Sequence, residues 1–128
     1  ENVLAPAAMY GDPASRRARA SELLELGGIS DLENVYANEL SGGELRRMSI
    51  ARALINDPPI VMADEPTGDL DDETTAMVIK LLKDCAKQGA SVLMVTHEQS
   101  ALAHADLIFR MEKGSLREYG ADERPENV

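Results

Sequence analysis

The sequence predicts an α/β protein in which a helical first part precedes parallel strands that are joined by a helix. Two short apolar runs, at residues 60–63 and 91–96, have the composition of parallel strands buried on both faces. A long helical pattern over residues 71–87 lies between them. This order of strand, helix and strand is typical of a parallel sheet with right-handed crossovers.

The composition limits the class of protein. The 128 residues suffice for one domain or for part of one. Thirteen basic against 23 acidic residues give a formal net charge of −10, which argues against broad binding to nucleic acid or anionic membranes. Because aromatic residues make up only 3 % of the chain, the core must be aliphatic. Cys85 is the single cysteine, so we expect no intramolecular disulfide and no cysteine-rich metal site.

The first helix is expected after an irregular lead-in over residues 1–12. Asp12 has a side chain suited to the N-cap position, and Pro13 favours the first helical turn. Gly27 and Gly28 are expected to end this helix, because glycine adopts the left-handed conformation that helix ends require.

A second helix is expected to begin at a capping box. Ser41 and Glu44 have the Ser-x-x-Glu spacing of that motif, and apolar residues recur at helical spacing over residues 45–55. The segment before the box, residues 29–40, is expected to form no more than a short helical turn.

From residue 60 onward, strands and helices alternate along the chain. We expect a strand at 60–63, a helix at 71–87, a strand at 91–96, a short helix at 98–104 and a strand at 107–111. Lys113 and Gly114 favour a hairpin after the last strand. By the same βαβ logic, the third strand is expected to join the parallel sheet.

Three side chains are candidates for chemistry at the carboxyl edge of this sheet, where open α/β sheets bind ligands. Asp64 and Glu65 end the first strand. One of them can hold a divalent metal ion while the other polarises a water molecule. His97 follows the second strand and can donate to a phosphate oxygen or orient a water. From the residues alone, two solvated turn acids and a surface histidine are open alternatives.

A second candidate site is the glycine loop before the second helix. The amino end of a helix carries unpaired N–H groups and a partial positive charge, and Gly42 and Gly43 allow a phosphate to approach the backbone. Ser41 adds a hydroxyl donor, and Glu44 completes the loop. An ordinary capped helix is the alternative.

Other polar side chains receive a structural interpretation. Arg46 and Arg52 are interpreted as a solvated helix face, and a role for Arg47 is left open. His104 is expected within a short helix, and Cys85 is expected to pack on the apolar face of the 71–87 helix.

These motifs form one ordered series along the chain. Leu-Ser-Gly-Gly-Glu at residues 40–44, Ile-Val-Met-Ala-Asp-Glu at 60–65, Gly-Asp-Leu-Asp at 68–71 and His97 together strongly resemble the ATP-binding-cassette (ABC) ATPase family. They resemble its signature loop, its Walker B strand with the catalytic glutamate, its D-loop and its switch histidine. The resemblance runs to about residue 119. It is most similar to the branch serving lipoprotein release, macrolide export and antimicrobial-peptide resistance.

The resemblance implies a P-loop NTPase-like fold with ATP and Mg²⁺ as cofactors. By that resemblance, Asp64 would coordinate the Mg²⁺ shell, Glu65 would polarise the attacking water and His97 would contact the γ-phosphate. The loop of Ser41, Gly42, Gly43 and Glu44 would close over the γ-phosphate of ATP on the opposite subunit. The segment 68–71, with Asp71, would line the dimer seam. Glu44 departs from the family pattern, in which glutamine is commoner in transporters.

One family motif is missing from the sequence. No Gly-x-x-x-x-Gly-Lys-Ser/Thr, the phosphate-cradling Walker A loop, occurs among the 128 residues. We therefore expect the carboxyl-terminal part of a cassette: residues 1–56 from the helical subdomain, 57–119 from the ATPase core, and 120–128 as a tail. Such a chain is expected to lack ATPase activity by itself and to self-associate through an open strand edge.

The expected parent is the nucleotide-binding subunit of an ABC transporter, cytoplasmic and peripheral on the inner face of the cell membrane. Its expected partners are a second nucleotide-binding subunit, forming a homodimer, and a transmembrane permease, with no nucleic acid. Two alternatives are part of a DNA-repair or chromosome-maintenance ABC-type ATPase, and a non-catalytic binding module. The first would need long coiled coils before residue 40, and no heptads occur there.

Overall fold

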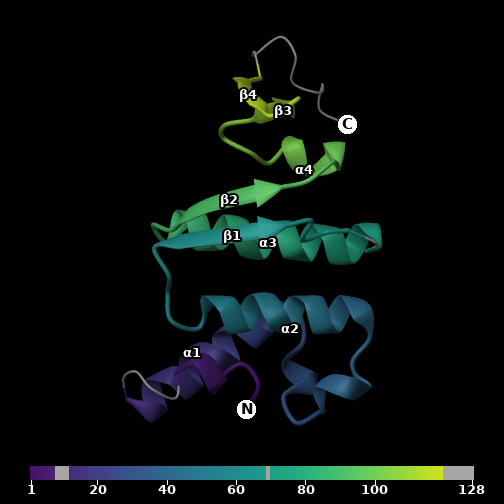
Figure 1. The fold of residues 1–128 in the computed structure, drawn as a ribbon. Helices are drawn as coiled ribbons and strands as arrows, with labels where there is room; N and C mark the ends of the chain where they lie inside the picture. The colour runs from purple at the N-terminus through teal and green to yellow at the C-terminus, as the bar shows by residue number, and fades with distance from the viewer. Residues whose placement is uncertain (8–11, 69, 120–128) are drawn as a thin grey trace.

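A computed structural model describes residues 1–7, 12–68 and 70–119 of the chain. Short 3₁₀ turns occur at Ala5–Ala7, Ser30–Leu32 and Ala37–Glu39. The helices and strands are α1 (Pro13–Leu26), α2 (Gly42–Leu54), β1 (Ile60–Asp64), α3 (Asp72–Lys87), β2 (Ser91–Val95), α4 (Gln99–Leu102), β3 (Phe109–Glu112) and β4 (Ser115–Glu118). Helices α1 and α2 form one end of the molecule, the β1–β2 sheet with α3 behind it forms the middle, and the β3–β4 hairpin lies at the other end (Figure 1).

Helix α1 has the predicted ends. The carboxylate of Asp12 accepts a hydrogen bond from the backbone N–H of Ser15 at 2.9 Å, so it caps the first turn. Gly28 has a φ of 64°, the left-handed conformation that stops a helix. Leu23 and Leu24 of α1 are buried in the core.

Helix α2 begins at the predicted capping box and packs its apolar stripe against α1. Its buried side chains are Met48, Ala51 and Leu54, which follow helical spacing. Ile55, directly after the helix, is also completely buried. Where one short helical turn was predicted between these helices, the structure has two 3₁₀ turns, Ser30–Leu32 and Ala37–Glu39.

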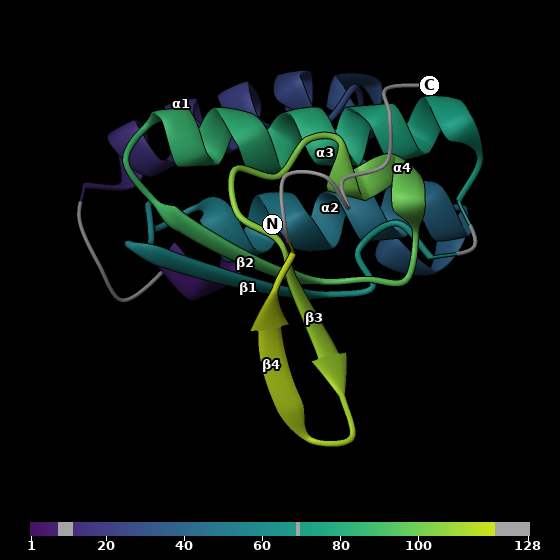
Figure 2. The ribbon, with the colours of Figure 1, turned by 90° about the horizontal axis from the view of Figure 1, so that it is seen from above.

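Strands β1 and β2 pair in parallel, as predicted, and Met62 lies opposite Leu93. The prediction that both faces of the sheet are buried is wrong. Figure 2 shows α3 on one side of the sheet only, where Val61 is buried. On the other side, Met62 is 78 % exposed and Leu93 is 59 % exposed. In the described residues, the sheet contains these two strands alone.

The prediction that the third strand joins the parallel sheet is also wrong. Strand β3 pairs with β4 in an antiparallel hairpin of its own. Lys113 and Gly114 at its turn have φ values of 49° and 81°. Two left-handed residues in succession form the tight turn that matches the twist of antiparallel strands, so local pairing with β4 prevails. Between β2 and β3 lies only the four-residue helix α4, shorter than the predicted helix.

Two other predictions concern residues that the structure does not describe. The predicted tail, residues 120–128, lies outside the described residues, as does Asp69 of the predicted D-loop. Across the described parts of the chain, no helix combines the length and the apolar character needed to cross a membrane.

Candidate functional site

The carboxyl ends of β1 and β2 and the amino end of α2 lie on the same side of the molecule (Figure 1). The topology produces this arrangement, because α2 and α3 run opposite to the strands that follow them. All the candidate residues predicted from the sequence belong to this side.

Glu65 follows directly after β1 in a left-handed conformation, with a φ of 44°. Its backbone N–H donates to the carbonyl oxygen of Val95 at 2.8 Å, which joins the ends of the two strands. Left-handed φ values are unfavourable for residues other than glycine, and they persist where surrounding contacts fix the backbone.

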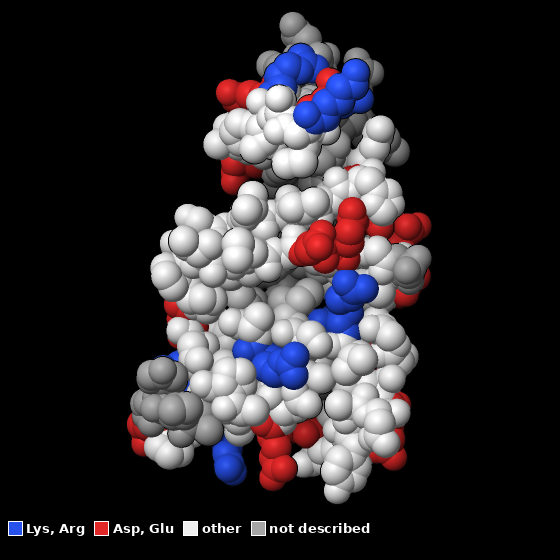
Figure 3. Space-filling view, in the orientation of Figure 1, with Lys and Arg blue, Asp and Glu red and all other residues white. Residues whose placement is uncertain are grey.

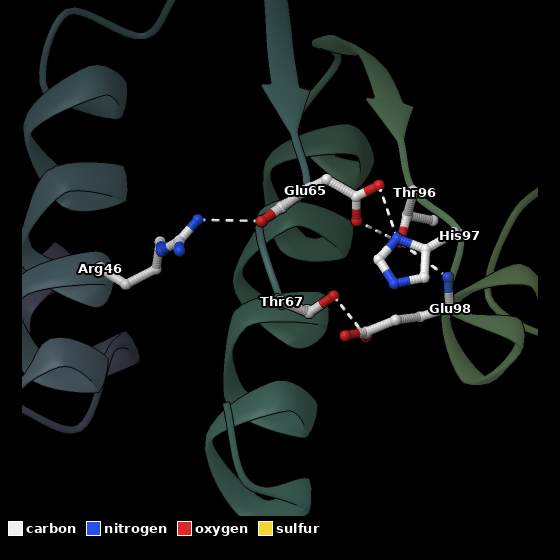
Figure 4. Close-up of polar contacts among 6 residues, drawn as sticks. All are labelled: Arg46, Glu65, Thr67, Thr96, His97 and Glu98. Carbon is white, nitrogen blue, oxygen red and sulfur yellow. Dashed lines mark hydrogen bonds and ion pairs between the residues drawn. The ribbon is translucent and has the colours of Figure 1, made fainter. Parts of the chain in front are cut away.

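The carboxylate of Glu65 contacts two side chains that follow β2 (Figure 4). Its Oε1 lies 2.9 Å from Nδ1 of His97, and its Oε2 accepts a hydrogen bond from Oγ1 of Thr96 at 3.2 Å. A carboxylate can only accept, so Nδ1 of His97 carries the proton in this contact. The sequence therefore predicted correctly that Glu65 and His97 meet at one edge of the sheet.

This contact lowers the pKa of the Glu65 carboxyl. The hydrogen bond from His97 is the main reason that the pKa of the Glu65 carboxyl lies below its ordinary value, and Thr96 contributes in the same direction. The side chain of His97 is 83 % exposed. The pair thus consists of a carboxylate that stays ionised and an imidazole that a ligand can reach.

A second layer of hydrogen bonds supports the pair. The hydroxyl of Thr67, which is completely buried, donates to Oε2 of Glu98 at 2.6 Å. The backbone N–H of Glu98 donates to Oγ1 of Thr96 at 3.0 Å. The first bond joins the segment after β1 to the segment after β2, and the second fixes Thr96 within the segment after β2. Thr67, Thr96 and Glu98 were not predicted as site residues, although each lies just beyond the end of a strand, which is the signal that could have found them.

Asp64 occupies the last position of β1, opposite Val95, and its side chain is exposed. It lies on the open face of the sheet, together with Met62, since alternate strand residues share a face. Within the described residues, no three acidic, histidine or cysteine side chains gather into a complete metal site.

The loop at the start of α2 has the predicted capping box. The backbone N–H of Ser41 donates to Oε2 of Glu44 at 2.7 Å, and the backbone N–H of Glu44 donates to Oγ of Ser41 at 3.3 Å. The first of these bonds is the main reason that the pKa of the Glu44 carboxyl is lowered. Glu44 therefore stabilises the conformation of its own loop through its hydrogen bonds with Ser41.

The two glycines of the loop differ in their surroundings. A Cβ atom at Gly42 would meet nothing within 4 Å, so this position is open to an approaching ligand. A Cβ atom at Gly43 would lie 3.2 Å from Cγ2 of Thr74, so glycine here permits close packing against α3.

Asp71 caps α3. Its two carboxylate oxygens accept hydrogen bonds from the backbone N–H and the hydroxyl of Thr74, each at 2.9 Å. The backbone bond is the main cause of the lowered pKa of the Asp71 carboxyl. Nη1 of Arg47 donates to Oγ1 of Thr74 at 3.2 Å, so α2 is joined to the cap of α3.

The interpretation of Arg46 as a solvated residue is wrong. Its Nη1 donates to the backbone carbonyl of Glu65 at 2.9 Å in a partly buried contact. The helical spacing of α2 shows which residues face the core, but it cannot show which backbone carbonyl a long side chain reaches. Arg52 does lie at the surface, where it donates to Oδ1 of Asn2.

Charged side chains are mixed on the face seen in Figure 3. Toward the strand ends, an acidic group lies directly above a basic one, while uncharged side chains cover the rest of the sheet. This face has no continuous basic stripe of the kind that follows a nucleic-acid backbone.

Parallel strands with carboxylates and a histidine at their carboxyl ends are typical of α/β proteins that bind ligands at that edge. Residues 1–68 match the sequence family described as ABC transporter. The chain belongs to this family.

Three curated relatives illustrate the range of the family. The chain is 43 % identical over 119 residues to the uncharacterized ABC transporter ATP-binding protein MJ1508 of Methanocaldococcus jannaschii, covering 92 % of this chain and 53 % of that protein. It is 43 % identical to the macrolide export ATP-binding/permease protein MacB of Nitrosomonas europaea, covering 91 % and 18 %. It is 42 % identical to the methionine import ATP-binding protein MetN of Brucella abortus, covering 94 % and 33 %.

A solved structure confirms the fold. The dimeric, post-hydrolysis ATP-binding cassette MJ0796 bound to ADP and Pi matches with a TM-score of 0.72 and 34 % identity. The match covers 85 % of this chain and 49 % of that one. The predicted P-loop NTPase-like α/β class is therefore confirmed, and the chain spans about half the length of MJ1508 and of the cassette it matches.

Proposed function

We propose that the full-length protein binds and hydrolyses ATP as the nucleotide-binding subunit of an ABC transporter. The observation that carries this proposal is the contact between Glu65 and His97 at the end of the sheet (Figure 4). An ionised carboxylate can polarise a water molecule, and an exposed imidazole can donate to a phosphate oxygen. Phosphoryl transfer needs mainly such positioning and charge stabilisation.

In this proposal, Glu65 polarises the attacking water and His97 contacts the γ-phosphate. Mg²⁺ bound with the nucleotide would neutralise charge on the phosphates. Asp64 would hold it, because Mg²⁺ commonly takes one or two carboxylates together with substrate phosphates. The exposed position of Asp64, one residue before Glu65 at the end of β1, fits such a shared site.

The loop at the start of α2 would serve a nucleotide on a second copy of the subunit. The open space at Gly42 and the hydroxyl of Ser41 suit a phosphate, whereas Gly43 and Glu44 maintain the shape of the loop. We place Asp71 and residues 68–71 at the seam between the copies. The dimeric state of the matched cassette MJ0796 supports a paired arrangement.

We also propose a transmembrane permease as partner, with the subunit peripheral on the inner face of the membrane. MacB is named as an ATP-binding/permease protein, which supports this association. The motif resemblance favours the branch serving lipoprotein release, macrolide export and antimicrobial-peptide resistance. However, MetN is named as an import protein and is almost equally similar, so we assign no transported molecule.

The test is Glu65→Gln in the full-length protein. The amide keeps the shape of the side chain but loses the charge, so ATP should still bind while phosphate release falls on the order of a hundredfold. Glu118→Gln, an exposed change in β4, is the matched control and should be unaffected. Turnover near the wild-type rate in Glu65→Gln would contradict the proposal.

Two further measurements extend the test. His97→Ala should also lower turnover, because it removes the proposed γ-phosphate contact. The 128-residue chain alone should show no magnesium-dependent ATP hydrolysis, since its sequence contains no phosphate-cradling loop. Turnover by this chain that Glu65→Gln abolishes would show that the residues described here suffice.

A further inference from the structure

We propose that Arg46 is a positioning residue for Glu65, fixing the turn after β1 to the helix that begins at the glycine loop. This inference rests on the proposed role of Glu65 in polarising water. It concerns a side chain that makes no contact with the carboxylate itself and acts on the backbone that carries it (Figure 4).

The carbonyl oxygen of Glu65 accepts two hydrogen bonds. Nη1 of Arg46 donates at 2.9 Å, and the backbone N–H of Gly68 donates at 3.2 Å. Pro66, the next residue, has no N–H to contribute to the turn. Because Glu65 has a left-handed φ of 44°, its backbone needs contacts of this kind to persist.

Arg46 is the one described contact of Glu65 that comes from the helical part of the molecule. The backbone N–H of Glu65 is held by Val95, and its carboxylate is held by Thr96 and His97, all of them in or after β2. These contacts hold the backbone N–H and the carboxylate of Glu65 to the sheet, whereas Arg46 joins its backbone carbonyl to α2. A hydrogen bond from a charged donor is stronger than a neutral one, so this link is firm.

The link also connects two proposed nucleotide contacts. Arg46 lies in the second turn of α2, whose N-cap is Ser41, and buried side chains such as Met48 hold the helix against the core. Arg46 therefore joins the helix that begins at the proposed phosphate loop to the turn of Glu65. If the loop contacts the nucleotide on a second copy, Arg46 makes the position of the Glu65 turn depend on that contact.

The neighbouring arginines provide a comparison within the same helix. Arg47 donates to the hydroxyl of Thr74 on α3 and has no contact with Glu65 among the described hydrogen bonds. Arg52 donates to Asn2 at the surface, far along the helix from the loop. Arg52 thus has the charge and helical setting of Arg46 without its position, which makes it the matched control.

The experiment measures steady-state ATP hydrolysis by the full-length protein carrying Arg46→Met, Arg46→Lys or Arg52→Met. Arg46→Met should lower kcat about tenfold, while the KM for MgATP stays within about twofold, because no proposed nucleotide contact is removed. Arg46→Lys should recover part of the rate, since its ammonium can still donate to the carbonyl. Arg52→Met should match the wild type.

An unchanged kcat in Arg46→Met would overturn the inference, as would a lysine variant no faster than the methionine variant. A rise in KM with unchanged kcat would overturn it too, since it would assign Arg46 to ATP binding. If Arg46→Met lacks a cooperative thermal transition, Arg46→Gln takes its place with the same expectation. Glu65→Gln is measured alongside: wild-type turnover there contradicts the proposed function, whereas an inactive Glu65→Gln beside a fully active Arg46→Met contradicts only this inference.

Discussion

The helical region (residues 12–55) and the sheet region (residues 60–119) differ in how completely they bury their apolar side chains. In the helical region, the large apolar residues of the core are at most 8 % exposed; they are Leu23, Leu24, Ile29, Met48, Leu54 and Ile55. In the sheet region, one face of the β1–β2 sheet packs against α3, whereas the other is open to solvent (Figures 2 and 3).

The large apolar residues of the open face are Ile60, Met62, Leu93 and Val95, each more than half exposed. The difference follows from side-chain geometry. A helix with a single apolar stripe can bury it against one neighbour, but a strand that is apolar at every position needs a layer on both sides. Exposed apolar surfaces of this kind are typical sites of association.

The largest expected effect is a difference in the free energy of unfolding lost when an apolar side chain is shortened in each region. Leu54→Ala should lower the free energy of unfolding of the chain by about 3 kcal/mol, because it leaves a cavity in a closed core. Met62→Thr, on the open face, should change it by less than about 0.5 kcal/mol. Urea unfolding of both variants is the measurement, at a protein concentration below the one at which the chain self-associates. Equal losses would mean that the open face is covered in solution.

The next effect concerns association through the open face. We expect the 128-residue chain to self-associate, because the face is apolar and β1 has an unpaired edge in the described residues. Leu93→Thr together with Met62→Thr should weaken this association about tenfold, or about 1.4 kcal/mol. Light scattering over a concentration series measures it, with Glu118→Gln as a control. A monomeric wild-type chain at high micromolar concentration would contradict the prediction.

A smaller effect is expected at the cap of α1. Asp12→Ala removes the acceptor for the N–H of Ser15 and should cost about 1 kcal/mol of unfolding free energy. Glu25→Ala, an exposed change later in the same helix, should cost less. If the two variants unfold alike in urea, the cap contributes nothing, and α1 is held by packing alone.

The smallest effect is a pH dependence. The folded-state pKa of Glu65 is lowered chiefly by His97, so its stabilising contribution is present above its ordinary pKa of 4.5 and is lost as the pH falls through the folded value. The unfolding free energy of Glu65→Gln should therefore fall less steeply below pH 4.5 than that of the wild type. Thermal unfolding between pH 3 and 6 measures this, and parallel curves would contradict it.

The pKa of Glu44, in the helical region, can be compared with the pKa of Glu65, in the sheet region. Its pKa is also lowered, with the same sign, but its partner Ser41 is only three residues away. A peptide covering α2 should retain the shift of Glu44, whereas the shift of Glu65 depends on a histidine 32 residues away and requires the folded sheet. Carboxyl titration by NMR in the peptide and in the chain tests the difference.

The sequence by itself determined the features that depend on near neighbours. The cap at Asp12, the stop at Gly28 and the box of Ser41 and Glu44 each use partners within a few residues, so spacing reveals them. The meeting of Glu65 and His97 was also predictable, because parallel strands bring their carboxyl ends to one edge.

Only the tertiary structure decided the features that depend on distant partners. Strand β3 could have joined the parallel sheet, but pairing with β4 through a tight turn prevailed. Whether an apolar strand is covered on both faces depends on what other chain segments supply, which no local pattern encodes. Arg46 reaches a carbonyl 19 residues away, and a helical pattern specifies only the direction in which a side chain leaves the helix, not the group that it meets.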